Sequence, residues 1–148
     1  MKKSAVAHVN IKEEFARAFP EPFSVDFKRV EKWENHEIPL LRSGNVIFKD
    51  TRVLDALIAK VHADVAIFVK VGDDFIRVVT TLKQEDGSSA RGTHLNHSNP
   101  AYEHLLKGHG FTGRVNLFGH EFDAEYEAIK DKDGKIIGAY RVGNPISK

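Results

Sequence analysis

The fold is decided by a stretch that opens with Val65-Ala66-Ile67-Phe68-Val69-Lys70-Val71, continues with Gly72-Asp73-Asp74, and then reads Phe75-Ile76-Arg77-Val78-Val79-Thr80-Thr81-Leu82-Lys83. β-branched and aromatic residues dominate the first and third runs, so both are predicted strands. The Gly-Asp-Asp triplet between them is a natural hairpin connection. We therefore expect an antiparallel pair here and work outward from it.

The rest of the stretch adds one helix and three strands. Pro100 is suited to the first position of a short helix that carries Tyr102. Strands are predicted at 111–118, 122–130 and 135–142, with a second hairpin signal in the Asp-Lys-Asp-Gly sequence at 131–134. Two strands, a helical crossover and three strands predict an α+β fold with a central antiparallel sheet of about five strands.

The residues before this stretch predict two further helices. Apolar residues recur through 4–19 until Pro20 ends the pattern, and a second helical spacing follows Thr51 over 52–63. The first helix either covers the sheet or is a long signalling helix that pairs with its copy in a dimer. Between the two helices, 23–50 alternates weakly like strands, with a break expected at Pro39 and a turn at 43–45.

Composition narrows the class of protein. At 148 residues the chain is the size of one domain, and its net charge of +1 is spread along the sequence, so no nucleic-acid partner is expected. Cysteine is absent, which excludes disulfides and thiolate chemistry. Apolar runs are too short to cross a bilayer, so the chain as written is expected to be soluble.

The order of these elements resembles the extracytoplasmic, PAS-like Cache modules of bacterial chemoreceptors. The resemblance rests on Ala66-Ile67-Phe68-Val69, Gly72-Asp73-Asp74-Phe75-Ile76-Arg77-Val78, Gly92-Thr93, Asn99-Pro100-Ala101-Tyr102, Thr112-Gly113-Arg114, Leu117-Phe118-Gly119 and Gly134-Lys135-Ile136-Ile137-Gly138. It implies a single Cache domain over 1–148, with an N-terminal helix and linker at 1–22 and a sensor core at 23–143. It also implies that the chain is a piece from between two membrane helices, which are flanking segments absent from it.

The function that the resemblance implies is ligand sensing at the periplasmic or extracellular face of the inner membrane, in a methyl-accepting chemotaxis receptor. The ligand would be a small organic anion such as a short carboxylate, and the receptor a homodimer through the N-terminal helix. No enzymatic activity and no cofactor are expected. Alternatives are the sensor domain of a histidine kinase or cyclase, a stand-alone binding or dimerisation module with an occluded pocket, and a small metal-dependent enzyme.

Arg77 is the first candidate for ligand binding, because it lies within an apolar strand where an unpaired guanidinium is costly to bury. A three-residue hairpin loop would place Arg77 opposite Val69 and Thr81 opposite Val65. A carboxylate could then bind the guanidinium and the hydroxyl of Thr80 or Thr81. The alternatives are a salt bridge to Glu125, Glu127 or another acid on a neighbouring strand, or solvent exposure.

The other candidates are Arg91, Tyr102 and Tyr126. Related modules usually read Gly-Ser-Arg-Ala-Val-Gly-Thr where this chain has Gly-Ser-Ser-Ala-Arg-Gly-Thr at 87–93, so the arginine is shifted by two positions. Arg91 is therefore either a compensating anion contact or a surface arginine. Tyr102 and Tyr126 are phenolic hydrogen-bond partners for a ligand, or ordinary packing.

Histidines and acids predict no metal or catalytic centre. His94 and His97 lie three apart in an expected loop with no second paired motif, so we predict no metal site. Asp123, Glu125 and Glu127 alternate along one strand, which is typical of a polar strand face. Sequence motifs for nucleotide binding or hydrolysis are absent.

Overall fold

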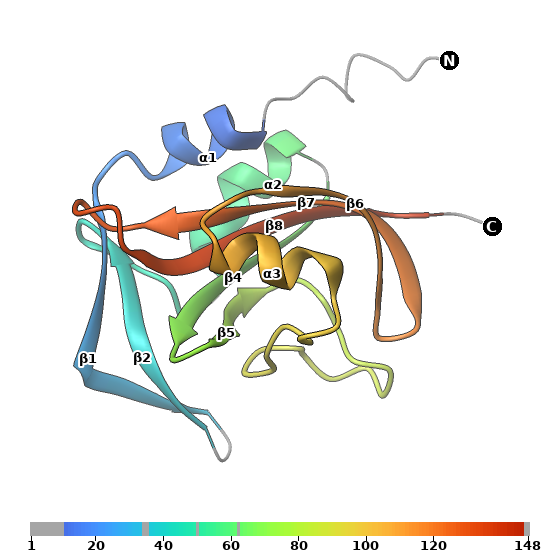
Figure 1. The fold of residues 1–148 in the computed structure, drawn as a ribbon, viewed down its shortest axis with the longest axis horizontal. Helices are drawn as coiled ribbons and strands as arrows, with labels where there is room; N and C mark the ends of the chain where they lie inside the picture. Colours follow the sequence, from blue (N-terminus) through green and yellow to red (C-terminus); the bar gives the residue numbers. More distant parts are fainter. Residues whose placement is uncertain (1–10, 34–35, 50, 62, 147–148) are drawn as a thin grey trace.

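Two antiparallel sheets form the framework of the structure, a computed structural model that describes residues 11–33, 36–49, 51–61 and 63–146 (Figure 1). The three-stranded sheet has the order β1 (Phe23–Trp33), β2 (His36–Ser43) and β3 (Val46–Ile47). The five-stranded sheet has the order β5 (Asp74–Thr80), β4 (Asp64–Val71), β8 (Ile136–Pro145), β7 (His120–Lys130) and β6 (Phe111–Leu117). The helices are α1 (Ile11–Ala18), η2 (Thr51–Leu54), α2 (Asp55–Val61) and α3 (Pro100–Leu106).

The predicted α+β fold is confirmed, and so is the antiparallel sheet of five strands with a helical crossover between its second and third strands. In α3, Pro100 follows the N-cap Asn99, whose side chain accepts a hydrogen bond from the N–H of Ala101. The fixed φ of proline suits this first turn, where its missing N–H costs nothing.

The first half of the chain holds more strand than its weak alternation predicts. Pro39 does not break the pattern, because it lies within β2 opposite Val30, where the register shifts between Asp26 and Val30. Where the register shifts, one backbone N–H is not needed for strand pairing, so proline, which has no N–H, is tolerated there. The turn predicted at 43–45 is confirmed, and Gly44 takes a positive φ of 57° there.

Helix α1 covers the sheet, which is one of the two alternatives predicted for the N-terminal helix. Its Phe15 is 5% exposed and stacks on Tyr140 of β8, with the ring centroids 3.8 Å apart. Residues 4–10 of the predicted helix lie outside the described residues. The second predicted helix is confirmed over its main part, although it starts as the short 3₁₀ turn η2.

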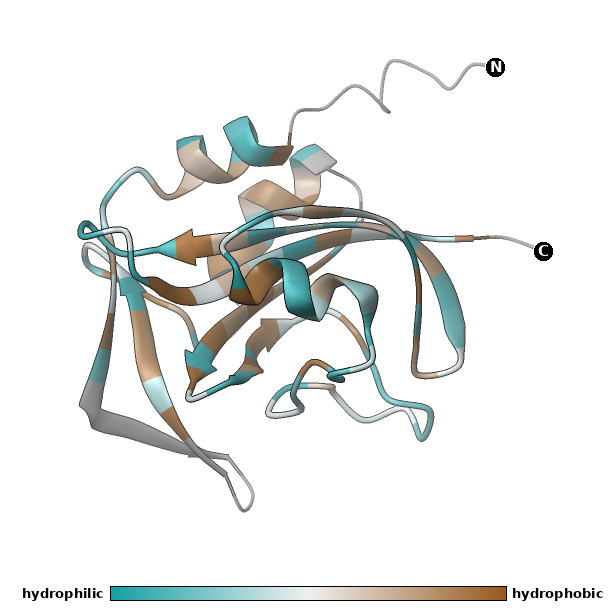
Figure 2. Ribbon diagram, in the orientation of Figure 1, coloured by the Kyte–Doolittle hydropathy of each residue, from teal (hydrophilic) through white to brown (hydrophobic). Residues whose placement is uncertain are grey.

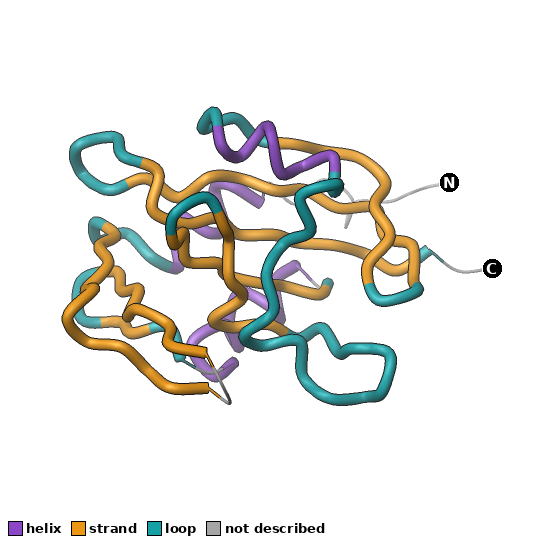
Figure 3. The backbone as a smooth tube through the Cα atoms, turned by 60° about the horizontal axis from the view of Figure 1, so that its bottom comes forward, coloured by secondary structure: helices purple, strands orange, loops and turns teal. Residues whose placement is uncertain are grey.

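Each face of the five-stranded sheet carries its own core. On β4, Val65, Ile67 and Val69 point to a core shared with α1, α2 and β2, while Ala66 and Phe68 point to a second core under α3. Strand β4, largely brown in Figure 2, is therefore apolar on two sides, and β8 beside it is buried over most of its length. The second core is completed by residues 81–99, a segment that crosses over the strands in Figure 3.

The hairpin of β4 and β5 differs from the predicted register. Its turn has two residues, since Val71 pairs with Asp74, and this places Arg77 opposite Phe68 rather than Val69. A register shift then leaves Val78 as an extra residue in β5. The shift restores the other predicted neighbour, because the N–H of Thr81 donates to the carbonyl of Val65 at 3.0 Å.

Candidate ligand-binding site

Two arginines are buried on the sheet face that lies under α3 and the 81–99 segment. Arg77 of β5 is 1% exposed and Arg141 of β8 is 0% exposed. Neither forms an ion pair with an acidic side chain among the described residues. The predicted alternative of a salt bridge from Arg77 to Glu125 or Glu127 is therefore not what the described part of the chain shows.

The guanidinium of Arg77 is hydrogen-bonded to the 81–99 segment. Its Nη1 donates to the hydroxyl of Thr93 at 3.0 Å and to the carbonyl of His94 at 3.4 Å, while its Nε has no partner. The guanidinium carbon lies 5.1 Å from the ring centre of Phe68 and 5.3 Å from that of Phe118. Two aromatic faces and two neutral acceptors stabilise the charge without neutralising it.

Electrostatics at Arg77 reflect this environment. Burial lowers the pKa of Arg77 below its ordinary value, to about 10, with Tyr126 raising it and Arg141 lowering it again. The contribution of Arg141 means that each positive charge lies within the electrostatic reach of the other. Both guanidiniums still carry a proton at neutral pH, so this face of the sheet holds two positive charges.

Arg141 has fewer partners still. None of its three guanidinium nitrogens meets the distance and angle of a hydrogen bond, although the Tyr126 hydroxyl lies near enough to raise its pKa, and its guanidinium carbon lies 4.8 Å from the ring centre of Phe122. The side chain lies flat over Gly143, where an added Cβ would come within 2.8 Å of the guanidinium carbon. Glycine at 143 is therefore needed for the arginine to adopt this position. Burial lowers the pKa of Arg141, whereas Tyr126 and Asp64 raise it.

Tyr126 connects this face to α3. It is 0% exposed, pairs with Arg141 across β7 and β8, and its hydroxyl receives a 3.4 Å hydrogen bond from the side-chain amide of Asn99. Since Asn99 also caps α3 through its oxygen, one amide joins the start of the helix to the sheet.

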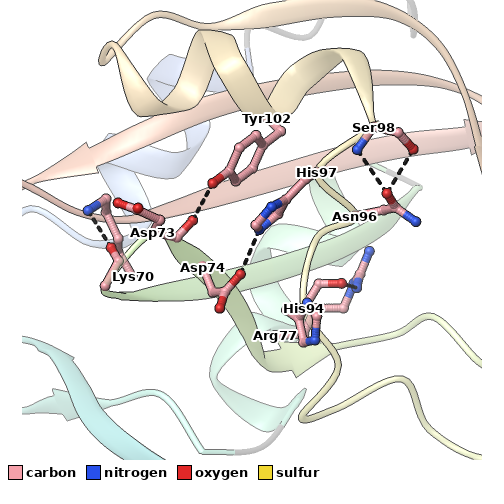
Figure 4. A network of polar contacts seen from close by, with 10 residues as sticks. Lys70, Asp73, Asp74, Arg77, His94, Asn96, His97, Ser98 and Tyr102 are labelled. Carbon is pink, nitrogen blue, oxygen red and sulfur yellow. Dashed lines mark hydrogen bonds and ion pairs between the residues drawn. The ribbon is translucent and has the colours of Figure 1, made fainter.

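Tyr102 uses its hydroxyl to fasten α3 to the β4–β5 turn (Figure 4). It donates to the carbonyl of Asp73 at 2.6 Å, and its ring stacks on His97 with centroids 4.2 Å apart. His97 in turn contacts Asp74, with Nε2 and Oδ1 2.7 Å apart. A ligand role for Tyr102 stays a prediction, while its position closes the segment over the sheet.

The other predicted residues lie apart from the guanidinium of Arg77. Arg91 donates from Nε to the carbonyl of Val78 at 2.7 Å. The hydroxyl of Thr80 accepts from the N–H of Leu82, and that of Thr81 contacts Asp64 and Val65. Their roles in ligand binding stay predictions, but the hydroxyl that meets Arg77 belongs to Thr93.

Sequence reasoning missed Arg141, Thr93 and Asn99 as residues of this face. A signal for Arg141 was present, because it interrupts an apolar strand in the same way as Arg77 does. Thr93 and Asn99 lie in a segment without regular structure, where no periodicity indicates which side chains turn inward.

Two further features bear on the class of protein. Among the described residues, no three histidine, aspartate or glutamate side chains come together as ligands for a metal ion. In the same part of the chain, no helix has both the length and the apolar character to cross a membrane.

The family model for the Cache 3/Cache 2 fusion domain matches residues 2–148. A search of curated proteins found no similar sequence.

Proposed function

Because the chain belongs to the Cache 3/Cache 2 fusion domain family, whose members are sensor and ligand-binding modules, we propose that it senses a small organic anion for a transmembrane chemoreceptor. The anion would be a short carboxylate bound at Arg77. The domain would work at the periplasmic or extracellular face of the inner membrane.

The observation that supports this proposal is the environment of the buried guanidinium of Arg77. Its guanidinium is 1% exposed, has a nitrogen without a partner, and faces no acid among the described residues. A buried charge that lacks a counter-charge costs several kcal/mol in a folded protein. An anionic ligand would offset that cost on binding, through charge-assisted hydrogen bonds.

Signalling would follow from closure of the 81–99 segment over the ligand. This segment already contacts Arg77 through Thr93 and is fastened by the Tyr102 and His97 contacts. A ligand that binds the closed form better than the open form shifts the equilibrium between them. The shift would reach the output domain through the flanking helices.

The proposed homodimer would pair through the N-terminal helix. In the described part of that helix, Phe15 is turned into the domain's own core, while Glu13 and Arg17 are exposed. Pairing would therefore use a charged surface here, or the residues that precede Ile11.

A thermal-shift screen of the 148-residue chain tests the proposal. Short carboxylates, amino acids, purines and divalent metals would each be added to the wild type, to Arg77→Ala and to Arg114→Met, which removes an exposed arginine and serves as the control. A carboxylate should raise the apparent Tm of the wild type and of Arg114→Met but not of Arg77→Ala. At about 100 times Kd the gain is about 2.7 kcal/mol.

Other outcomes of the screen favour the alternatives. Stabilisation by metals alone would contradict an anion sensor. A flat response across all classes would favour a module whose pocket is filled by its own side chains, since Phe68 and Phe118 already cover Arg77. A histidine kinase or cyclase carrying this input domain would give the same positive result and differ only in the attached output domain.

A further inference from the structure

We infer that the ligand carries two acidic groups, one bound by Arg77 and the other by Arg141. This inference rests on the proposed function and specifies its ligand class as short dicarboxylates. It assigns Arg141 as the second anion-binding residue of the site.

Strand pairing brings the two arginines to one face. Phe68 of β4 pairs with Arg77 on one side and with Ala139 on the other. Arg141 is two residues beyond Ala139 in β8 and therefore faces the same way. Only β4 separates the two strands, a sideways span of about 10 Å, which two arginine side chains and a short carbon chain can bridge.

Small side chains lie between the two arginines. Ala66 pairs with Arg141, and Ala139 lies in the row of Arg77, so no large side chain other than Phe68 rises from β4 or β8 on this part of the face. Gly143 gives the guanidinium of Arg141 room to lie close to the sheet. The floor between the cations is therefore low and apolar, which suits the carbon chain of a dicarboxylate.

Both guanidiniums have N–H donors without a hydrogen-bond partner. Arg77 has an unpartnered Nε, and Arg141 has three unpartnered nitrogens, all buried. One carboxylate could neutralise only one of the two charges, and the second would stay buried and unpaired. Two carboxylates would satisfy both and remove the repulsion between them.

The hairpin of β6 and β7 covers both cations with aromatic rings. Phe118 in its turn lies against Arg77, and Phe122, the third residue of β7, lies against Arg141. Figure 1 shows this hairpin bending toward the side of the 81–99 segment, and Gly119 in its turn comes close to Glu85 of that segment. The rings shield the site from water, which strengthens the interaction of each guanidinium with a carboxylate.

The test is calorimetric titration with matched ligand pairs. Dicarboxylates of three to five carbons would be compared with the monocarboxylates of equal carbon number, on the wild type and on Arg77→Met, Arg141→Met and Arg141→Lys. Arg114→Met, which removes an exposed arginine of β6, controls for the loss of one positive charge.

We expect at least one dicarboxylate to bind the wild type about tenfold or more tightly than its monocarboxylate partner. Arg141→Met should remove that advantage and leave monocarboxylate affinity within about twofold, while Arg141→Lys should keep part of it. Arg77→Met should weaken both ligands, and Arg114→Met neither. Circular dichroism of each variant checks that it is folded.

Two results would overturn the inference, and they are distinguishable. Monocarboxylates that bind as tightly as dicarboxylates, with no effect of Arg141→Met, would leave the anion sensor standing with a single charge at Arg77. Absence of binding by every carboxylate would overturn the proposed function together with the inference.

Discussion

A buried arginine without an ion pair lowers the stability of the fold, and Arg141 is such a residue in the described part of the chain, with Asp64 acting on it only beyond ion-pair distance. All its guanidinium nitrogens are unpartnered at 0% exposure. We expect Arg141→Met to increase the free energy of unfolding without ligand by about 1 to 4 kcal/mol, because a hydrophobic side chain of similar volume replaces an unpaired charge. Chemical denaturation in urea measures the change.

Arg91→Met is the matched control for that measurement. Arg91 donates to the carbonyl of Val78, so removal of its guanidinium leaves a part-buried acceptor and should decrease stability, by about 1 kcal/mol. A loss of stability in Arg141→Met comparable with that of Arg91→Met would mean that Arg141 has structural partners, and would contradict its assignment to the ligand site.

Glu125 of β7 offers a second test at this scale, through pH. Partial burial raises the pKa of Glu125, Glu127 raises it further, and Lys12 lowers it. A carboxyl group whose pKa is higher in the folded state destabilises the fold when ionised. The penalty is present above the folded pKa and disappears as the pH falls below the ordinary value of 4.5.

Glu125→Gln should therefore stabilise the domain at neutral pH, by a few tenths of a kcal/mol because the site is partly exposed, and should have no effect in acid. Thermal denaturation on both sides of the ordinary carboxyl pKa tests this. Glu121→Gln, at an exposed position of the same strand, should show no such difference. Equal stabilisation by the two variants would indicate a general charge effect.

The limits of prediction at the residue scale follow from the nature of each signal. An arginine within an apolar strand can be recognised from sequence, which is why Arg77 was predicted and why Arg141 was open to the same argument. Partners supplied by an irregular segment cannot be recognised from sequence, because no periodicity in that segment indicates that Thr93, rather than Thr80 or Thr81, lies beside the guanidinium.

At the scale of elements, the turn between β6 and β7 holds a bulky residue in a strained conformation. Phe118 has a φ of 52°, and it is followed by Gly119 with a φ of 86°. A phenylalanine in the left-handed region costs about 1 to 2 kcal/mol, and strain of this kind is common beside functional sites. Contact between its ring and Arg77 is the structural reason for the residue.

Phe118→Asn should therefore separate stability from binding. Asparagine adopts the left-handed conformation more easily, which offsets the lost packing of the partly buried ring, so stability without ligand should change by no more than about 1 kcal/mol. Anion affinity should fall by roughly threefold to tenfold, because the ring no longer shields Arg77. Unchanged affinity, measured by the same calorimetric titration, would show that the ring packs without serving the site.

The succession of strands and the helical crossover along the chain could be predicted from the sequence, because each run has its own composition and is bounded by turn residues. The register of β4 and β5 did not, since one residue more or less in a turn moves every pairing, and the register shift at Val78 leaves no mark in the apolar pattern. Pro39 shows the same limit, because its tolerance in β2 depends on a shift in the partner strand β1.

At the scale of the whole molecule, ligand binding should alter the two faces of the sheet differently. The amides of Gly92 and Leu95 donate to Arg77 and Phe75 of β5 and report on docking of the 81–99 segment. With ligand at about 100 times Kd, their hydrogen exchange should slow by up to about a hundredfold. The amide of Gly134, in the turn after β7, should change little.

Hydrogen exchange followed by mass spectrometry or NMR gives this comparison. Equal slowing at Gly92, Leu95 and Gly134 would indicate a general gain in stability and would contradict closure of the segment. No change at any of the three, with ligand bound, would place the anion elsewhere on the domain.

Tyr140 and Arg141 are consecutive in β8, and they point into opposite cores: the tyrosine ring lies 3.8 Å from that of Phe15 in α1, and the guanidinium lies in the candidate site. These two residues therefore connect the candidate site to helix α1 on the opposite face of the sheet. Because the chain contains no cysteine, a single cysteine introduced at the exposed Ala16 of α1 would take a fluorescent label without competition. A biosensor built in this way would read the occupancy of the arginine site from the far side of the sheet, with the dye clear of the ligand.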